Sequence, residues 1–297
     1  MTNRLPTVEV SLSYNHFFWM MRILLTLTSL LVLNAVSGCS GIFYFPQKTH
    51  VQTPDRSGLD YEDVFLESAD NVTIHGWWLQ ARAPVRGTVY FLHGNAENIS
   101  THFQNVAWLP EHGYQVFLID YRGFGKSQGK ARLPGALQDV GTGFQFVLDR
   151  NTEPGKPVYL LGQSVGASMA IYFAANDQQA KQNLSAVISD AAFTRYSEIT
   201  RYATGQNWLT WPLQYPISWS VIRGYDPVDY IAEISPVPLL LIHSKDDPII
   251  PYVFSQELRR AALSPTTFFT TGGPHTATFN SRKNREFLLE FLAETGK

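Results

Sequence analysis

Residues 158–170 read VYLLGQSVGASMA, and this stretch decides how the rest of the chain is interpreted. Four apolar residues lead directly into Gly162 to Gly166 (GQSVG), and small residues at helical spacing follow. The pattern predicts a buried strand, a tight turn and a helix. At such a turn a serine is forced into a sparsely populated backbone conformation that presents its hydroxyl as a nucleophile. Ser164 is therefore either a catalytic nucleophile or a polar residue between two buried elements, and its context decides between them.

Strands and helices alternate on both sides of this stretch. Strands are predicted at 72–79, 88–92, 114–119, 158–161, 186–189, 238–242 and 267–270, and helices at 134–149, after Ser164 and at about 285–293. The first strand alternates in polarity and is expected to be antiparallel. The others predict the α/β class, with a mostly parallel central sheet flanked by helices. Ligands of such sheets bind beyond the carboxyl ends of the strands.

The segment 193–230 interrupts this alternation. It is dense in tyrosine and tryptophan and contains no clear strand. An insertion at this place predicts a short, aromatic-rich cap over the edge of the sheet. Ordinary packing of a helical connection is an equally open interpretation.

A serine nucleophile needs a base, and the base needs a carboxylate to orient it. Of eight histidines, only His275 lies beyond the late strands, in the loop sequence TGGPH, whereas His243 ends a strand and is expected to be structural. Asp246 and Asp247 both follow the strand 238–242, and Asp190 is a more remote candidate. In this architecture the chain order should be serine, acid, histidine, which these residues satisfy.

The transition state also needs hydrogen-bond donors for its oxyanion. The strand 88–92 ends in His93-Gly94-Asn95, where a glycine lets the backbone turn its amides toward the pocket. The N–H groups of Asn95 and Val165 are the predicted oxyanion hole. Arg122 and Gly123, in the next strand-end loop, are expected to brace this turn rather than react.

The N-terminal region has the pattern of an export signal. Arg22 precedes an apolar run of about 14 residues, which is too short to span a bilayer as a helix. The stretch 36–39 (VSGC) resembles the bacterial lipobox, which implies lipidation of Cys39, the single cysteine of the chain. Because Ser40 follows rather than aspartate, the resemblance implies an outer-membrane lipoprotein facing the periplasm.

Three segments follow from these assignments. Residues 1–38 are expected to be an N-terminal extension and lipoprotein signal peptide, and 39–60 a tether. Residues 61–297 are expected to form the catalytic domain with its cap.

Five motifs together resemble the α/β-hydrolase superfamily, especially its small abhydrolase-domain serine hydrolases of the bud-emergence type. They are Phe91 to Ala96 (FLHGNA), Asp120 to Ser127 (DYRGFGKS), Gly162 to Gly166, Asp247 to Pro251 (DPIIP) and His275. In that family the acid is the aspartate four residues before the proline of a D-x-x-x-P stretch, which implies Asp247 rather than Asp246. Ala167 departs from the second glycine that relatives often carry there.

The expected function is hydrolysis of ester-like substrates through an acyl-enzyme on Ser164, with Asp247 and His275 completing the triad. The substrate is expected to be a small apolar or amphipathic acyl compound. Amide cleavage, acyl transfer, or a catalytically silent binding protein on the same fold are the alternatives. A net charge of −2 without a basic block argues against nucleic acid. No cofactor and no metal site is expected, and Asp120 stands where a P-loop needs glycine.

Overall fold

The structure is a computed structural model that describes residues 18–23, 26, 40–82, 84–151 and 155–296. Its strands are β1 (Phe45–Pro46), β2 (Tyr61–Glu67), β3 (Thr73–Leu79), β4 (Gly87–Leu92), β5 (Ala96–Glu97), β6 (Tyr114–Asp120), β7 (Val158–Gln163), β8 (Leu184–Asp190), β9 (Leu239–Ser244) and β10 (Thr266–Thr271). Its α-helices are α2 (Ile99–His102), α3 (Gly135–Arg150), α4 (Val165–Asn176), α5 (Gln178–Asn183), α6 (Tyr196–Gly205), α7 (Gln214–Ser220), α8 (Pro227–Tyr230), α9 (Tyr252–Ala261) and α10 (Arg282–Thr295).

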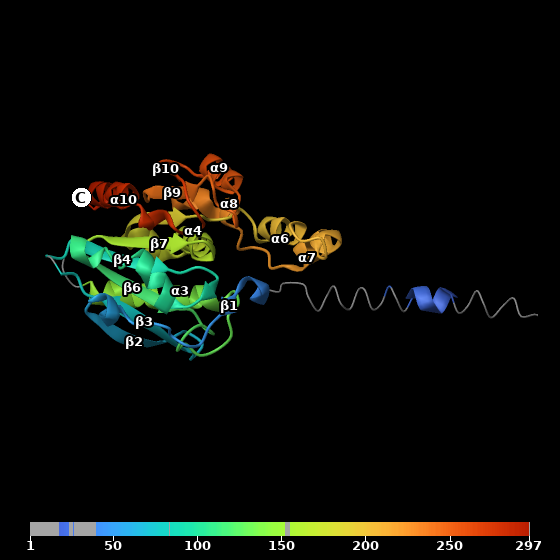
Figure 1. Cartoon of the computed structure of the whole chain (residues 1–297), viewed down its shortest axis with the longest axis horizontal. Coiled ribbons are helices and arrows are strands. Elements are labelled where there is room, and N and C mark those ends of the chain that lie inside the picture. Colours follow the sequence, from blue (N-terminus) through green and yellow to red (C-terminus); the bar gives the residue numbers. More distant parts are fainter. Residues whose placement is uncertain (1–17, 24–25, 27–39, 83, 152–154, 297) are drawn as a thin grey trace, which may run out of the picture.

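Eight strands form one sheet in the order β10-β9-β8-β7-β4-β6-β3-β2 (Figure 1). From β10 to β6 all neighbours are parallel, and β3 pairs antiparallel with both β6 and β2. Every residue of β4, β7 and β9 is buried, as expected for central strands covered on both faces. The predicted α/β fold with a mostly parallel sheet and an antiparallel early strand is confirmed.

Two apolar cores cover the two faces of this sheet. Successive residues of β4 point to opposite faces, so Tyr90 belongs to one core and Phe91 to the other. Helices α3 and α4 contribute Phe144 and Met169 to the first core. On the opposite face, α10 contributes Leu292. The sheet is therefore a rigid platform whose carboxyl-end loops can carry a site.

The edge strand β2 has no counterpart among the predicted strands. Only Val64 of its seven residues is buried, since the strand lies at the edge and faces solvent on most sides. The apolar signal that marks a buried strand is therefore weak there.

The predicted tether 39–60 is wrong over the residues that the structure describes. The side chain of Ser40 hydrogen-bonds the main chain of Leu133, and Tyr44 is buried against the sheet core. Strand β1 pairs with β5, and Leu59 belongs to the second core. Residues 40–60 are thus part of the domain, because their apolar side chains and polar main chain find partners on it.

The remaining N-terminal predictions concern residues whose structure is not described. Cys39 and most of the predicted signal peptide lie outside the described residues. Among the residues that are described, no helix combines the length and hydropathy needed to cross a bilayer.

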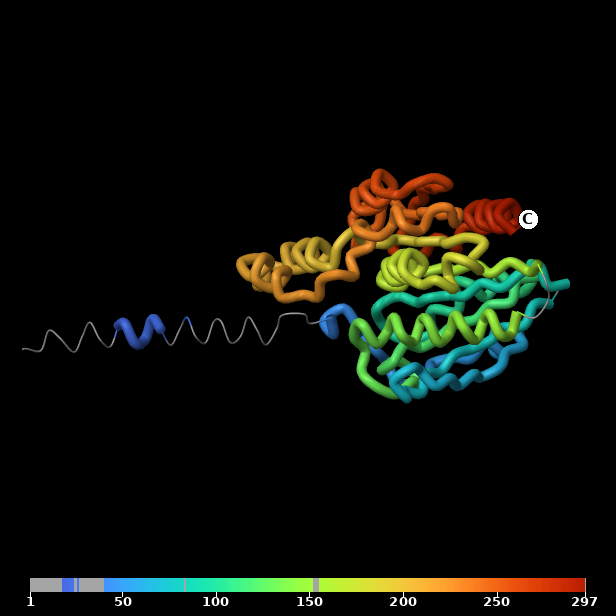
Figure 2. Tube along the Cα trace, turned by 180° about the vertical axis from the view of Figure 1, so that it is seen from behind, coloured from blue at the N-terminus to red at the C-terminus, as the bar shows by residue number. Residues whose placement is uncertain are grey.

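The segment predicted as a cap lies between β8 and β9. It contains α6, the short 3₁₀ helix η5 (Trp211–Leu213), α7 and α8. Figure 1 and Figure 2 show α6 and α7 projecting from the body of the domain, beyond one end of the sheet.

Candidate active site

Ser164 occupies a strained turn between β7 and α4. Its backbone has φ 57° and ψ −122°, an unusual conformation for a residue with a side chain. A Cβ at Gly162 would collide with the main chain of Gly166, and one at Gly166 with the carbonyls of Leu92 and His93. Both glycines are therefore required where strand, turn and helix meet. The serine is 7% exposed, at the carboxyl end of the sheet.

The loops after β9 and β10 bring Asp247 and His275 together. Oδ2 of Asp247 lies 2.6 Å from Nδ1 of His275, and Oδ1 accepts hydrogen bonds from the amides of Ile249 and Ile250. Burial raises the pKa of Asp247, but the hydrogen bond and charge of His275 and the two amides outweigh it, so the pKa lies below its ordinary value. An ionised carboxylate here fixes the ring and leaves its Nε2 free to act as a base.

The alternative residues have other partners. Asp246 is exposed and accepts a hydrogen bond from the amide of Gly273, at 3.2 Å. His243 is buried, and its Nε2 lies 2.8 Å from the carbonyl oxygen of Ile250 and 3.6 Å from Oδ2 of Asp247, so the carbonyl is its hydrogen-bond partner. The structure thus pairs His275 with Asp247 and leaves Asp246 outside that contact.

Asp190 connects the serine turn to the histidine loop. Its carboxylate accepts hydrogen bonds from Gln163 Nε2 at 2.8 Å and from Thr278 Oγ1 at 2.9 Å. Gln163 also reaches the carbonyl of Thr276, next to His275. Burial raises the pKa of Asp190 to about 6 despite these bonds. No pattern in the sequence marks Gln163 and Thr278, because their role depends only on which loops meet.

Among the described residues, no hydrogen bond joins Ser164 to His275, and the hydroxyl of Ser164 has no other hydrogen-bond partner. Catalytic hydrogen bonds are often long without substrate and tighten in the reacting complex. The network around Asp190 nevertheless holds both loops at the same edge of the sheet.

The loop after β4 lies beside Ser164. A Cβ at Gly94 would stand 3.7 Å from that of Ser164, and the carbonyl of Asn95 accepts a hydrogen bond from Phe45. Val165 is the first residue of α4, so its amide lies at the positive end of the helix. Asn95 and Val165 remain the predicted oxyanion donors. Tyr121 donates its hydroxyl to the carbonyl of His93 and braces this loop from the next strand.

The predicted brace at Arg122 has clear partners. Its guanidinium binds Asp139 at 2.8 Å and Asp70 at 2.7 Å. Gly123 has φ +89°, and a Cβ there would collide with the main chain of Ala131. Both residues therefore shape the loop after β6.

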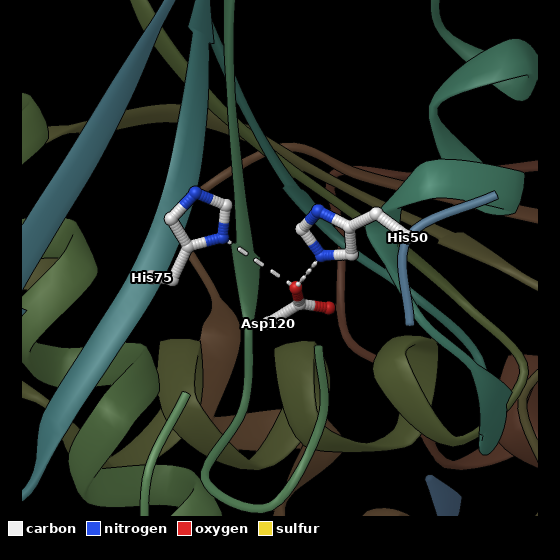
Figure 3. A group of neighbouring side chains, drawn as sticks. All are labelled: His50, His75 and Asp120. Atoms are coloured by element: carbon white, nitrogen blue, oxygen red, sulfur yellow. Dashed lines mark hydrogen bonds and ion pairs between the residues drawn. The ribbon is translucent and has the colours of Figure 1, made fainter. Parts of the chain in front are cut away.

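Outside the site, the half-buried His50 and the buried His75 and Asp120 lie together (Figure 3). Their donor atoms lie within 4.8 Å of one another and could hold a metal ion. Nε2 of His50 lies 2.8 Å from Asp120 Oδ2, a hydrogen-bond distance shorter than the roughly 3.4 Å between two ligands of tetrahedral zinc. Nε2 of His75 is bound to Asp63, and the main chain of Gly125 packs against the His50–Asp120 pair. We interpret the group as a hydrogen-bonded clamp that holds the segment at residue 50 on the end of β6.

A strand–serine–helix turn with an acid–histidine pair at the carboxyl edge of a mostly parallel sheet defines an α/β hydrolase. The family model described as "Serine aminopeptidase, S33" (Hydrolase_4) matches residues 83–231, and the chain belongs to this family.

Curated relatives and solved structures agree with this assignment. The uncharacterized protein YfhR of Escherichia coli O157:H7 is 32% identical, over 84% of this chain and 86% of its own. The lysophosphatidylserine lipase ABHD12 of Xenopus tropicalis is 27% identical, over 84% of this chain and 74% of its own. The Pyrococcus furiosus esterase Pf2001 superposes with a TM-score of 0.70 at 24% identity, covering 86% of this chain and 98% of that one. The chain is thus a hydrolase of the abhydrolase type.

Proposed function

We propose that this hydrolase cleaves carboxylic esters or thioesters of apolar or amphipathic compounds through an acyl-enzyme on Ser164. The contact between Asp247 and His275, at the same sheet edge as the strained Ser164 turn, is the observation that carries the proposal. In a serine hydrolase these groups form the nucleophile, its base and the residue that orients the base.

In the proposed reaction, Nε2 of His275 takes the proton of Ser164 as Oγ attacks the substrate carbonyl carbon. The oxyanion is held by the amides of Asn95 and Val165. His275 then gives the proton to the leaving oxygen or sulfur, and the acyl group stays on Ser164. A water molecule, deprotonated by His275, releases the acid and restores the serine. Asp247 stays ionised and stabilises the imidazolium in both halves.

A cleft between the cap and the acid loop supports an amphipathic substrate. It has a volume of about 460 Å³, and its lining includes Tyr202, Trp211, Pro251 and Phe254. That size is typical of small-molecule sites. The lining also includes Glu198, Arg201 and Gln214, so its mixture of aromatic and polar groups fits an amphipathic compound. Two similar proteins, an esterase and a lysophosphatidylserine lipase, support an ester substrate as well.

Labelling with a fluorophosphonate probe tests the nucleophile. Wild type should be labelled and Ser164→Ala should not. Ser189→Ala is the matched control, because Ser189 is buried at the end of the neighbouring strand and its hydroxyl lacks a hydrogen-bond partner among the described residues. Absence of labelling in folded wild type would remove the enzyme proposal and favour a silent binding protein.

The reaction class is tested by substrate series. Nitrophenyl esters of increasing chain length should be cleaved faster than aminoacyl nitroanilides. The family description names an aminopeptidase, so amide cleavage is the second candidate. If the anilides are turned over faster than every ester, amide cleavage is the favoured reaction.

We also propose that the protein is held at the cell envelope by lipid on Cys39, at the outer membrane facing the periplasm. The support is the apolar run before Cys39 and its lipobox-like context.

A further inference from the structure

The cap carries an exposed apolar surface made of Trp208, Leu209, Trp211, Leu213, Tyr215 and Trp219. The three tryptophans are 82%, 60% and 60% exposed. Soluble proteins seldom leave so many large apolar side chains together in water, and such patches mark interaction sites. We call this set the apolar cap surface.

The charge pattern around this surface fits a lipid bilayer. No Asp, Glu, Lys or Arg occurs from Tyr202 to Ile222, and the residues on either side are Arg201 and Arg223, both exposed. The Arg201 guanidinium lies 5.9 Å from the centroid of the Tyr215 ring. Tryptophan and tyrosine favour the interface between headgroups and acyl chains, while arginine at the rim reaches anionic headgroups.

The start of the folded domain lies beside the base of the cap. The 3₁₀ helix η1 (Gly41–Phe43) follows the predicted lipidation residue, and Phe43 packs edge-on against Tyr196, the first residue of α6, at 4.9 Å. Figure 1 and Figure 2 both show η1 at the end of the domain from which α6 and α7 project. A chain anchored just before Ser40 would therefore hold the cap close to the membrane.

Two further exposed apolar side chains lie in this initial segment. Ile42 is in η1 and Phe45 in β1. Cys39, the predicted lipidation residue, precedes them directly in the sequence. Apolar groups thus continue from the predicted anchor to the base of the cap.

We propose that the apolar cap surface docks into the lipid bilayer and acts with the N-terminal anchor as a second membrane contact. Docking would place the cleft at Trp211 and Phe254 at the level of the lipids, so that ester substrates enter from the membrane. The proposal rests on the proposed envelope location and deepens the proposed function. A second copy of the chain is the rival occupant.

The test uses the full chain reconstituted into vesicles of phosphatidylethanolamine and phosphatidylglycerol with or without brominated acyl chains, which quench tryptophan on contact. A Trp19→Phe background removes the exposed tryptophan outside the cap, and the remaining Trp77, Trp78 and Trp108 are buried. Brominated lipid should quench the cap tryptophans in this background. Replacing Trp208, Trp211 and Trp219 by serine should abolish that quenching.

Two controls separate docking from folding and from catalysis. Leu263→Ser removes an exposed apolar side chain outside the cap, just before the amino end of β10, and should leave quenching unchanged. Ser164→Ala should also leave it unchanged, so a failure of the proposed hydrolysis would not affect the result. Equal fluorescence in brominated and plain vesicles would overturn the proposal. So would a dimer in detergent that the triple serine variant dissociates, since a second copy would then cover the surface.

Discussion

Replacing Asp247 by asparagine tests the assignment of the acid with little change in shape. The carboxylate is fully buried and lies 2.6 Å from His275 Nδ1. In the variant the amide oxygen can still accept the hydrogen bonds from Ile249 and Ile250, so the loop should keep its conformation. The amide nitrogen, however, would then face Nδ1 as a donor.

A donor at that position selects the wrong tautomer of His275. Nδ1 becomes the acceptor, Nε2 carries the proton, and the ring cannot take the proton of Ser164. In serine proteases the corresponding change lowers kcat by about 10⁴, or about 5.5 kcal/mol in activation free energy. We expect a loss of about 10³- to 10⁴-fold in kcat for a nitrophenyl ester.

The matched control is Asp246→Asn, one residue away. Asp246 is exposed, and its carboxylate accepts a hydrogen bond from the amide of Gly273 and has no contact with His275 among the described residues, so kcat should change by less than about threefold. Thermal unfolding of both variants should stay within about 5 °C of wild type. The assignment is refuted if Asp247→Asn keeps a tenth of the wild-type kcat, or if Asp246→Asn loses as much.

Four further predictions concern the supports of the site. The pKa of Asp190 is raised to about 6, so the stability that the protonated group contributes is present below about pH 4 and is lost as pH rises through 6. Between pH 4 and 7, wild type should therefore lose about 2–3 kcal/mol of unfolding free energy relative to Asp190→Asn in urea titrations. Parallel plots of unfolding free energy against pH for the two proteins would contradict this. His50→Ala leaves the buried carboxylate of Asp120 without its 2.8 Å partner and should lower the free energy of unfolding by about 1–3 kcal/mol. Chelators should not shift the unfolding temperature of wild type, and a shift would instead indicate a bound metal. Gly166→Ala drives a methyl group into the main-chain carbonyls of Leu92 and His93 and should lower the unfolding free energy by about 3 kcal/mol or more in denaturant titration. An unchanged denaturation midpoint would argue against this close packing. Mass spectrometry of the mature N-terminus should find an acylated Cys39, and Cys39→Ser should abolish the modification; an unmodified wild-type cysteine would disprove the anchor.

Most of the sheet could be predicted because its central strands are buried on both faces. Runs such as 88–92 and 114–119 are continuously apolar, and the structure has strands at both places. The edge strand β2 escaped detection because Glu62, Asp63 and Glu67 interrupt its apolar residues, which form neither a continuous run nor a clean alternation. The tether prediction failed because residues 40–60 bury only isolated side chains such as Tyr44 and Leu59, and a single buried residue leaves no periodic pattern.

The candidate site was predictable only in part. Motifs identified Ser164 and His275, but the choice between two adjacent aspartates needed the resemblance to a family, because spacing alone places both at one strand end. Gln163 and Thr278 could not be predicted, since their hydrogen bonds to Asp190 join segments far apart in the sequence. Such contacts depend on tertiary packing and have no local signature.

The same buried network explains how the site holds its unusual backbone. Ser164, Ala191 and Thr276 all have positive φ angles although none is glycine, and each such residue costs about 1–3 kcal/mol. Each lies next to or within two residues of a member of the Gln163–Asp190–Thr278 group. Asp190 is itself unfavourable when ionised, because burial raises its pKa. Three strained residues and a buried acid thus lie together, and all of them lower the stability of the fold. In return, they fix the positions of the serine turn and the histidine loop relative to each other. That arrangement is expected where chemistry, rather than stability, determines the structure.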